Sequence, residues 1–184
     1  MPDSFLLPDL IAHSATRSPD ATALTYGKQS LSYAELQAQV EAFASGLRGI
    51  GLQRGERVAI YLEKRFEAVI ASFGTAAAGG VFVPLNPLLK PEQVSYILRD
   101  CNVRVLVTSN ERLSLLTESL VDCHDLLHVV LLDNCQGMLQ FLVITYTQQP
   151  SHWIWTTREM AEKNFQKLES TAPKDAYSKC RTPQ

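Results

Sequence analysis

Short apolar runs alternate with helix-like segments between residues 57 and 133, and this alternation constrains the fold more than any other feature. The runs are predicted to be strands, and they are Arg57–Leu62, Val81–Val83, Val103–Thr108 and Val129–Leu132. The segments between them are predicted to be helices, and they are Phe66–Ala78, Pro91–Asp100 and Glu111–Leu120. Continuously apolar strands are typical of sheets buried on both faces. The sequence therefore predicts an α/β fold, a partial doubly wound and largely parallel sheet with helices on both faces.

The first part of the chain carries signals for a helix, a hairpin and a longer helix. Residues Pro8–Arg17 are predicted to form the first helix, and Ala21–Tyr26 and Gln29–Leu31 two strands joined at a turn. Ser32 and Glu35 have the spacing of a capping box, in which each side chain accepts a hydrogen bond from the other residue's backbone N–H. Apolar residues then recur every three or four positions. We therefore expect an amphipathic helix that begins after Ser32 and ends at the glycines near residue 50.

The character of the sequence changes after Asn134. The strand–helix alternation stops, both tryptophans lie beyond this point, and Gly137 is the only glycine there. Met138–Tyr146 has the composition of a strand, and Thr157–Glu169 has that of a helix. Residues Ser170–Gln184 have the composition of a disordered segment. We therefore divide the chain into residues 1–134 and a divergent, partly disordered tail at residues 135–184, for which a shifted reading frame is one explanation.

Composition and charge argue against several classes of protein. The formal net charge is −2, which gives no reason to expect nucleic acid or an acidic membrane surface as a partner. The chain starts without a basic leader, and no stretch approaches the roughly 18–20 apolar residues that span a bilayer. We therefore expect a cytoplasmic location. No Cys-x-x-Cys pair is present, and free thiols are expected at Cys101, Cys123, Cys135 and Cys180.

Two short patterns resemble binding motifs but favour simpler interpretations. Gly49-Ile50-Gly51 with Gly55 has the glycines of a dinucleotide-binding loop, yet such a loop follows a strand and opens a helix. Here the glycines follow a predicted helix and precede a strand, which favours a helix end. His124 and His128 have the spacing that lets two histidines bind zinc from one helix face. The motif requires Glu in second place, this chain has Asp125, and His128 opens a predicted strand, so a surface loop is favoured.

Residue patterns that carry catalysis are absent. Cys123 lies beside His124, but sequence neighbours rarely have the geometry that activates a thiol. The Gly-x-Ser-x-Gly and Gly-x-x-x-x-Gly-Lys-Ser/Thr motifs do not occur. Asp100 has no acidic residue one turn before it with which to share acid–base chemistry. The residues therefore predict no catalytic, cofactor-binding or metal-binding side chain.

Two further segments carry distinctive motifs, and they are Leu31-Ser32-Tyr33-Ala34-Glu35-Leu36 and Gly79-Gly80-Val81-Phe82-Val83-Pro84-Leu85-Asn86-Pro87. They resemble the first and second core motifs of adenylate-forming enzymes. Their order and separation also match, as do residues 18–24 and 55–59. Residues 1–134 thus resemble the N-terminal portion of an AMP-dependent acyl-CoA synthetase or ligase domain. Residues 61–65 and 86–93 look most like the acyl-CoA ligases associated with bacterial exosortase systems.

This resemblance implies a two-step reaction. A carboxylate attacks the α-phosphate of ATP to give an acyl-adenylate, and the CoA thiol then displaces AMP. The full-length family uses ATP, Mg²⁺ and CoA, through a glycine-rich phosphate loop, an acidic ribose contact and a C-terminal lysine. None of these motifs occurs here, because Gly137 is the only glycine after Gly80 and the tail lysines lack the matching context. The two motifs that are present are expected to shape the fold, so no cofactor is expected to bind this chain.

Three functional hypotheses follow from the resemblance. The first is a truncated AMP-forming acyl-CoA ligase that is inactive alone. The second is a noncatalytic binding or interaction module that pairs with a full-length ligase or with another partner. The third is one piece of a split ligase whose remaining motifs come from another chain. A partial sheet leaves an edge and a buried face uncovered, so the first hypothesis predicts poor solubility or self-association.

Overall fold

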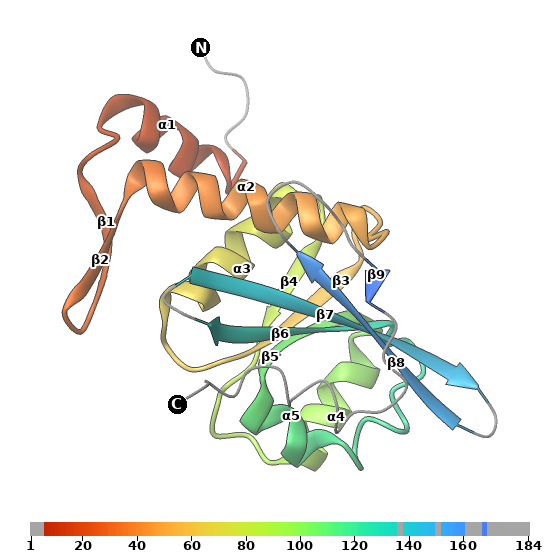
Figure 1. Ribbon diagram of the computed structural model, residues 1–184. Helices are drawn as coiled ribbons and strands as arrows, with labels where there is room; N and C mark the ends of the chain where they lie inside the picture. The colour runs from red at the N-terminus through yellow and green to blue at the C-terminus, as the bar shows by residue number, and fades with distance from the viewer. Residues whose placement is uncertain (1–5, 136–137, 150–151, 161–166, 169–184) are drawn as a thin grey trace.

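The computed structural model describes residues 6–135, 138–149, 152–160 and 167–168, and the side chains of residues 6–132. Within these residues the main sheet has seven strands in the order β4-β3-β5-β6-β7-β8-β9. The strands, in chain order, are β3 (Arg57–Tyr61), β4 (Val81–Pro84), β5 (Val103–Ser109), β6 (His128–Cys135), β7 (Met138–Gln149), β8 (His152–Met160) and β9 (Lys167–Leu168). Strands β4, β3, β5 and β6 are parallel, whereas β7, β8 and β9 continue the sheet in antiparallel pairs (Figure 1). The predicted α/β class with a largely parallel core is confirmed.

Helices cover both faces of the parallel strands, as the apolar runs predict. They are α2 (Tyr33–Gly49) and α3 (Phe66–Ala77) on one face, and α4 (Pro91–Asp100) and α5 (Asn110–Leu116) on the other. Successive residues of a strand point to opposite faces. Val58 and Ile60 of β3 accordingly pack in the core beneath α2 and α3, whereas Ala59 and Tyr61 pack in the core beneath α4 and α5. Both faces of the strand are therefore buried.

A helix and a hairpin precede the main sheet. The helix is α1 (Asp9–Arg17), and the hairpin pairs β1 (Thr22–Tyr26) with β2 (Gln29–Ser32) in a sheet of their own. Gly27 takes a φ of +61° at the tight turn between them, a conformation that glycine adopts at little cost. Both elements extend to one side of the molecule in Figure 1. The Tyr26 ring meets the edge of the Phe66 ring with centroids 6.2 Å apart, which joins the hairpin to the start of α3.

The long helix α2 begins and ends as the sequence predicts. The Ser32 hydroxyl accepts a hydrogen bond from the Glu35 N–H at 3.3 Å, and the Glu35 carboxylate accepts one from the Ser32 N–H at 2.8 Å. This reciprocal pair is the predicted capping box. Gly49 is the last helical residue, and Gly51 and Gly55 follow with φ values of +91° and +82°. The Gly49–Gly55 segment is therefore a helix end, and the dinucleotide-loop alternative is excluded by its place after a helix.

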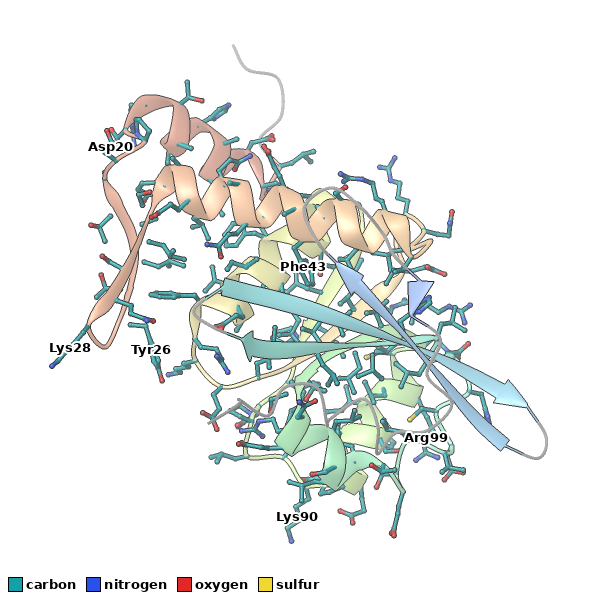
Figure 2. The ribbon with its side chains drawn as sticks, viewed as in Figure 1. Asp20, Tyr26, Lys28, Phe43, Lys90 and Arg99 are labelled. Atoms are coloured by element: carbon teal, nitrogen blue, oxygen red, sulfur yellow. The ribbon has the colours of Figure 1, made fainter. Side chains whose placement is uncertain are left out.

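Helices α2 and α3 lie close together because a glycine stands at their contact. Phe43 is buried on the side of α2 that faces α3 (Figure 2). A Cβ atom added to Gly74 of α3 would lie 2.6 Å from Phe43 Cδ1 and 3.1 Å from the Val40 carbonyl oxygen. Real Cβ atoms do not approach so closely, and the small residue thus sets the distance between the helices.

The predicted strand at Val81–Val83 is confirmed as β4, but it is an edge strand and is less buried than expected. Val81 is 49% exposed, because β3 is the only strand paired with β4 in the described part of the chain. The N–H groups of Val81 and Leu85 donate to Glu56 and Ile60. Because the direction of backbone hydrogen bonding alternates along a strand, the backbone groups of residues 82 and 84 point away from β3. Pro84 has no N–H, so the outer side of β4 is left with one strand donor, that of Phe82.

Two helix predictions need correction. Helix α5 ends at Leu116, four residues before the predicted end, where the Thr117 hydroxyl donates to the Leu113 carbonyl oxygen at 3.1 Å. Residues 157–160 of the predicted helix Thr157–Glu169 belong instead to β8, which pairs with β7 from Gln149↔His152 to Phe141↔Met160. This pairing outweighs the local helical composition. The predicted strand Met138–Tyr146 is confirmed within β7.

The predicted disordered segment Ser170–Gln184 lies outside the described residues, as do residues 161–166. Cys101 and Cys123 are free thiols, as expected, whereas the side chains of Cys135 and Cys180 are outside the described part. Among the helices that the structure describes, none has the length and apolar character needed to cross a membrane.

Candidate functional site

The carboxyl ends of the parallel strands form the edge at which open α/β sheets bind their ligands. Residues 62–65 follow β3 at this edge, residues 85–90 follow β4, and α5 follows β5 directly. We call five of the side chains with polar contacts at this edge the carboxyl-edge cluster: Tyr61, Glu63, Arg65, Glu67 and Arg112. A functional site of this fold would therefore be expected at this edge.

Arg112 joins three elements at this edge. Its Nη1 donates to the Pro87 carbonyl oxygen at 2.7 Å, and its Nη2 donates to Glu63 Oε1 at 3.1 Å. Its guanidinium also lies over the Tyr61 ring, 4.7 Å from the centroid. The Arg112 side chain is 17% exposed, whereas that of Glu63 is 70% exposed. Arg112 therefore fixes the loop after β4 chiefly through the Pro87 carbonyl and the Tyr61 ring, because a solvated carboxylate is a weak partner.

The loop at residues 85–90 is held by further bonds. The Tyr61 hydroxyl donates to the Leu89 carbonyl oxygen at 2.8 Å, and the Thr108 hydroxyl donates to the Tyr61 carbonyl oxygen at 3.2 Å. Asn86 Oδ1 accepts a bond from the Leu88 N–H at 3.0 Å, the local pattern that favours asparagine in turns. Asn86 and Pro87 of the second motif thus lie in a turn that is fixed from two neighbouring strands.

Arg65 and Glu67 form the second ion pair of the cluster. Arg65 Nε and Nη2 each donate to one carboxylate oxygen of Glu67, both at 2.8 Å. The Glu67 side chain is 7% exposed and lies in the first turn of α3, where a helix favours negative charge. A bidentate guanidinium compensates a buried carboxylate well. This pair therefore secures the start of α3 beside the end of β3.

The charged side chains of the carboxyl-edge cluster pair with one another in the described part of the chain. Both of its arginines are bound to carboxylates of the cluster. No three histidine, cysteine, aspartate or glutamate side chains of the described residues lie close enough together to hold a metal ion. The charged side chains of the cluster are thus paired with one another, and no reaction step can be assigned to them.

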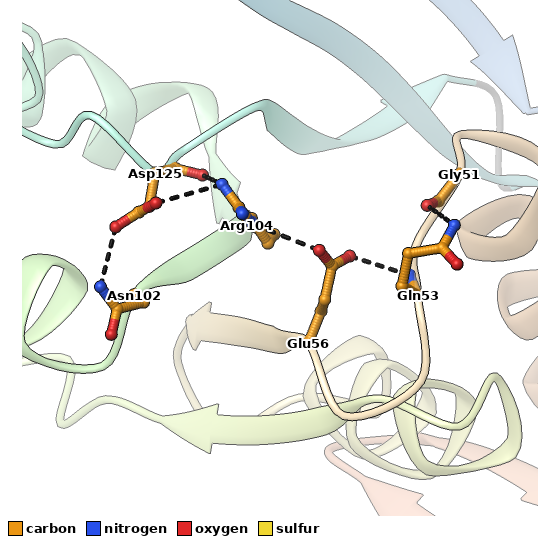
Figure 3. Close-up of polar contacts among 6 residues, drawn as sticks. All are labelled: Gly51, Gln53, Glu56, Asn102, Arg104 and Asp125. Carbon is orange, nitrogen blue, oxygen red and sulfur yellow. Dashed lines mark hydrogen bonds and ion pairs between the residues drawn. The ribbon is translucent and has the colours of Figure 1, made fainter.

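A second polar network lies at the opposite edge, where the parallel strands begin (Figure 3). Arg104 Nε contacts Glu56 Oε1 at 3.3 Å, and its Nη1 donates to Asp125 Oδ1 at 3.1 Å. Asn102 Nδ2 donates to Asp125 Oδ2 at 2.8 Å, and Glu56 Oε2 accepts a bond from the Gln53 N–H at 2.8 Å. The network ties the starts of β3 and β5 to the segment before β6.

The histidine pair does not have the arrangement that the zinc motif requires. His128 is the first residue of β6, as predicted, so the two histidines do not share a helix face. Asp125 between them binds Asn102 and Arg104. The segment belongs to the network that closes the amino-terminal edge of the sheet.

Cys123 lies in an environment that suppresses thiolate formation. It is 2% exposed, and burial raises the pKa of its thiol, while a hydrogen bond with Ser95 opposes the change. Its sulfur lies 3.5 Å from Ser95 Oγ. A nucleophilic cysteine needs a lowered pKa, so the nucleophile alternative loses its physical basis.

No local pattern in the sequence singles out Arg112 or Arg104. Arg112 reaches Pro87 across 25 positions and Glu63 across 49 positions of the chain. Only the parallel order of the strands brings these residues together. The predicted parallel arrangement was the one available signal, because parallel strands bring the residues after β3, β4 and β5 to the same edge of the sheet.

Comparisons with known proteins agree with this fold. The model of the AMP-binding enzyme family matches residues 11–178. Bacitracin synthase 1 of Bacillus licheniformis is 33% identical over 129 residues, 70% of this chain and 2% of that protein. The long-chain-fatty-acid–CoA ligase of Bacillus subtilis is 35% identical over 102 residues, 55% of this chain and 18% of that protein. The chain thus spans only a small part of the length of these two relatives.

Solved structures show the same relation. The anthranilate CoA ligase AuaEII, in complex with anthranoyl-AMP, superposes with a TM-score of 0.67 at 22% identity, over 87% of this chain and 34% of that one. The N-terminal domain of FACL13 from Mycobacterium tuberculosis superposes with a TM-score of 0.59 at 26% identity, over 62% of this chain and 30% of that one. Since the family model covers most of its length, the chain belongs to the AMP-binding enzyme family, as part of the N-terminal domain of the adenylate-forming ligases.

Proposed function

We propose that the chain supplies the first part of the scaffold of an AMP-forming acyl-CoA ligase, and that these 184 residues alone do not catalyse the reaction. In that reaction a carboxylate displaces pyrophosphate from ATP, and the CoA thiol then displaces AMP from the acyl-adenylate. Because an anion must approach a polyanion, the site needs compensating positive charge and phosphate-binding donors. The match to the AMP-binding enzyme family supports the first half of this proposal.

The arrangement of the carboxyl-edge cluster supports the second half. Arg112 and Arg65 are the arginines of this edge, and each is bound to a carboxylate of the same cluster. A phosphate would have to displace Glu67 from a bidentate pair or compete with Glu63. The sequence contains one glycine after Gly80, which leaves no glycine-rich loop to donate backbone N–H groups to phosphate. ATP, Mg²⁺ and CoA are accordingly proposed as ligands of the complete ligase only.

Carboxylate-dependent exchange between ATP and pyrophosphate tests the proposal directly. The purified chain would be assayed with fatty acids, aromatic acids and amino acids, because the relatives include both CoA ligases and peptide synthases. The Bacillus subtilis long-chain-fatty-acid–CoA ligase serves as the positive control. We expect no exchange above the rate without enzyme. Exchange that depends on any one acid, and that copurifies with the chain, would refute the proposal.

The subtype within the family is proposed to be that of the exosortase-associated acyl-CoA ligases. It rests on residues 61–65 and 86–93, which the fold places at one edge, with the Tyr61 hydroxyl 2.8 Å from the Leu89 carbonyl oxygen. Genomic context provides the test, because a ligase of this subtype should be encoded near exosortase genes. A locus without them would contradict the assignment but leave family membership intact.

We also propose that residues 1–134 are the N-terminal portion of the ligase domain and that residues 135–184 are a divergent, partly disordered tail. The family match runs to residue 178, beyond the proposed boundary. The coding sequence distinguishes a shifted frame from a merely divergent segment. If the frame is shifted, another frame of the coding sequence downstream of codon 134 encodes the missing Ser/Thr- and Gly-rich loop. If no other frame encodes it, the frameshift explanation fails.

A split ligase is the second candidate. The observation that favours it is that AuaEII superposes over most of this chain, although the chain covers only 34% of AuaEII. A second polypeptide with the remaining motifs would then restore activity. Co-expression with such a fragment, followed by pyrophosphate exchange, separates the two candidates, since only the split ligase predicts exchange. A cytoplasmic location is proposed for either, because the complete ligase would use soluble ATP and CoA.

A further inference from the structure

We draw no further inference here: the strongest candidate, the exposed apolar patch of Leu88 and Leu115 beside Arg112 at the carboxyl edge of the parallel strands, carries none because nothing in the structure shows what covers it.

Discussion

Arg112 and Glu63 contribute unequally to the ion pair that they form. Arg112 is 17% exposed and also contacts the Pro87 carbonyl and the Tyr61 ring, whereas Glu63 is 70% exposed. Exposed ion pairs stabilise proteins little. Hydrogen bonds from a charged donor contribute about 1.5–3 kcal/mol. Most of the stabilisation should therefore come from the contacts of Arg112 with Pro87 and Tyr61, and little from its ion pair with Glu63.

Replacing these two residues separately tests this inequality. We expect Arg112→Ala to lower the free energy of unfolding by about 2–3 kcal/mol, because it removes the bond to Pro87 and the ring contact. Glu63→Gln should lower the free energy of unfolding by less than about 1 kcal/mol. Urea denaturation at neutral pH measures both. Equal losses in the two variants would show that the ion pair, and not the Pro87 contact, dominates.

Glu35 gives the capping box a predictable dependence on pH. Its pKa lies below the ordinary value of 4.5, because the Ser32 backbone N–H and then the Ser32 hydroxyl donate to the carboxylate, while burial opposes the change slightly. A pKa that is lower in the folded state stabilises the fold fully above pH 4.5, and this contribution is lost as the pH falls through the lowered pKa.

Glu35→Gln should therefore be less stable than the wild type at pH 6, and the difference should shrink below pH 4.5. Thermal unfolding across this range measures the difference in melting temperature. Glu118→Gln is the matched control, since Glu118 is exposed and lies outside the capping box, and its melting temperature should differ little from that of the wild type throughout. A Glu35→Gln difference that stays constant down to pH 3 would contradict the assigned role of the carboxylate.

At the scale of elements, the contact between α2 and α3 depends on a residue that helix propensity disfavours. Alanine stabilises a helix interior by about 1 kcal/mol relative to glycine. At Gly74, however, an added Cβ would lie 2.6 Å from Phe43 Cδ1 and 3.1 Å from the Val40 carbonyl oxygen. The backbone oxygen cannot move away as a side chain can, so packing should outweigh propensity.

We expect Gly74→Ala to lower the free energy of unfolding by about 1–3 kcal/mol, the usual cost of overpacking. The double variant with Phe43→Leu should lose less free energy of unfolding than the two single variants together, because the smaller side chain relieves the closest contact. Denaturant unfolding of the three variants provides the double-mutant cycle. A Gly74→Ala variant as stable as the wild type would show that the helices separate freely.

Elements with a clear local signal could be predicted, and elements without one could not. The capping box at Ser32 and the proline at the start of α4 are local signals, and both helices begin where they indicate. Strand β8 is different, because its partners lie 3 to 19 positions away in β7 and no local signal specifies them. Burial of β4 was overestimated for the same reason, since apolar composition cannot show which strand lies at the edge.

The candidate site was predictable to a similar extent. The absence of a phosphate-binding loop follows from the sequence, because a glycine count needs no structure. The contacts of Arg112 could not be predicted, since they depend on three loops that meet only after the sheet forms. Non-local contacts of this kind are invisible to patterns that span a few residues.

At the scale of the whole molecule, β6 marks the change from parallel to antiparallel pairing. On one side it pairs with β5 from Val105↔His128, and on the other it pairs with β7 along its full length. Val129, Val130 and Leu131 of β6 are buried. Removal of β7 would leave this central strand with a row of unpaired backbone groups, which is a template for association.

A chain shortened to residues 1–134 should therefore associate more strongly than residues 1–184. We expect a concentration-dependent dimer of the shortened chain, because two β6 edges can pair with each other. Sedimentation velocity over a range of concentrations measures this, with residues 1–184 as the control. A shortened chain that stays monomeric and melts at the same temperature as the control would show that β7 contributes little to the sheet.

Pro84 limits how far such an association could proceed. A strand laid against the outer side of β4 would find a single strand donor, the N–H of Phe82, because proline contributes none. In polymer chemistry a monomer with two reactive ends forms long chains, whereas a monomer with one reactive end forms pairs. A shortened molecule with one open edge and one capped edge is a monomer of the second kind. Fibre growth by sheet extension would then stop at two molecules.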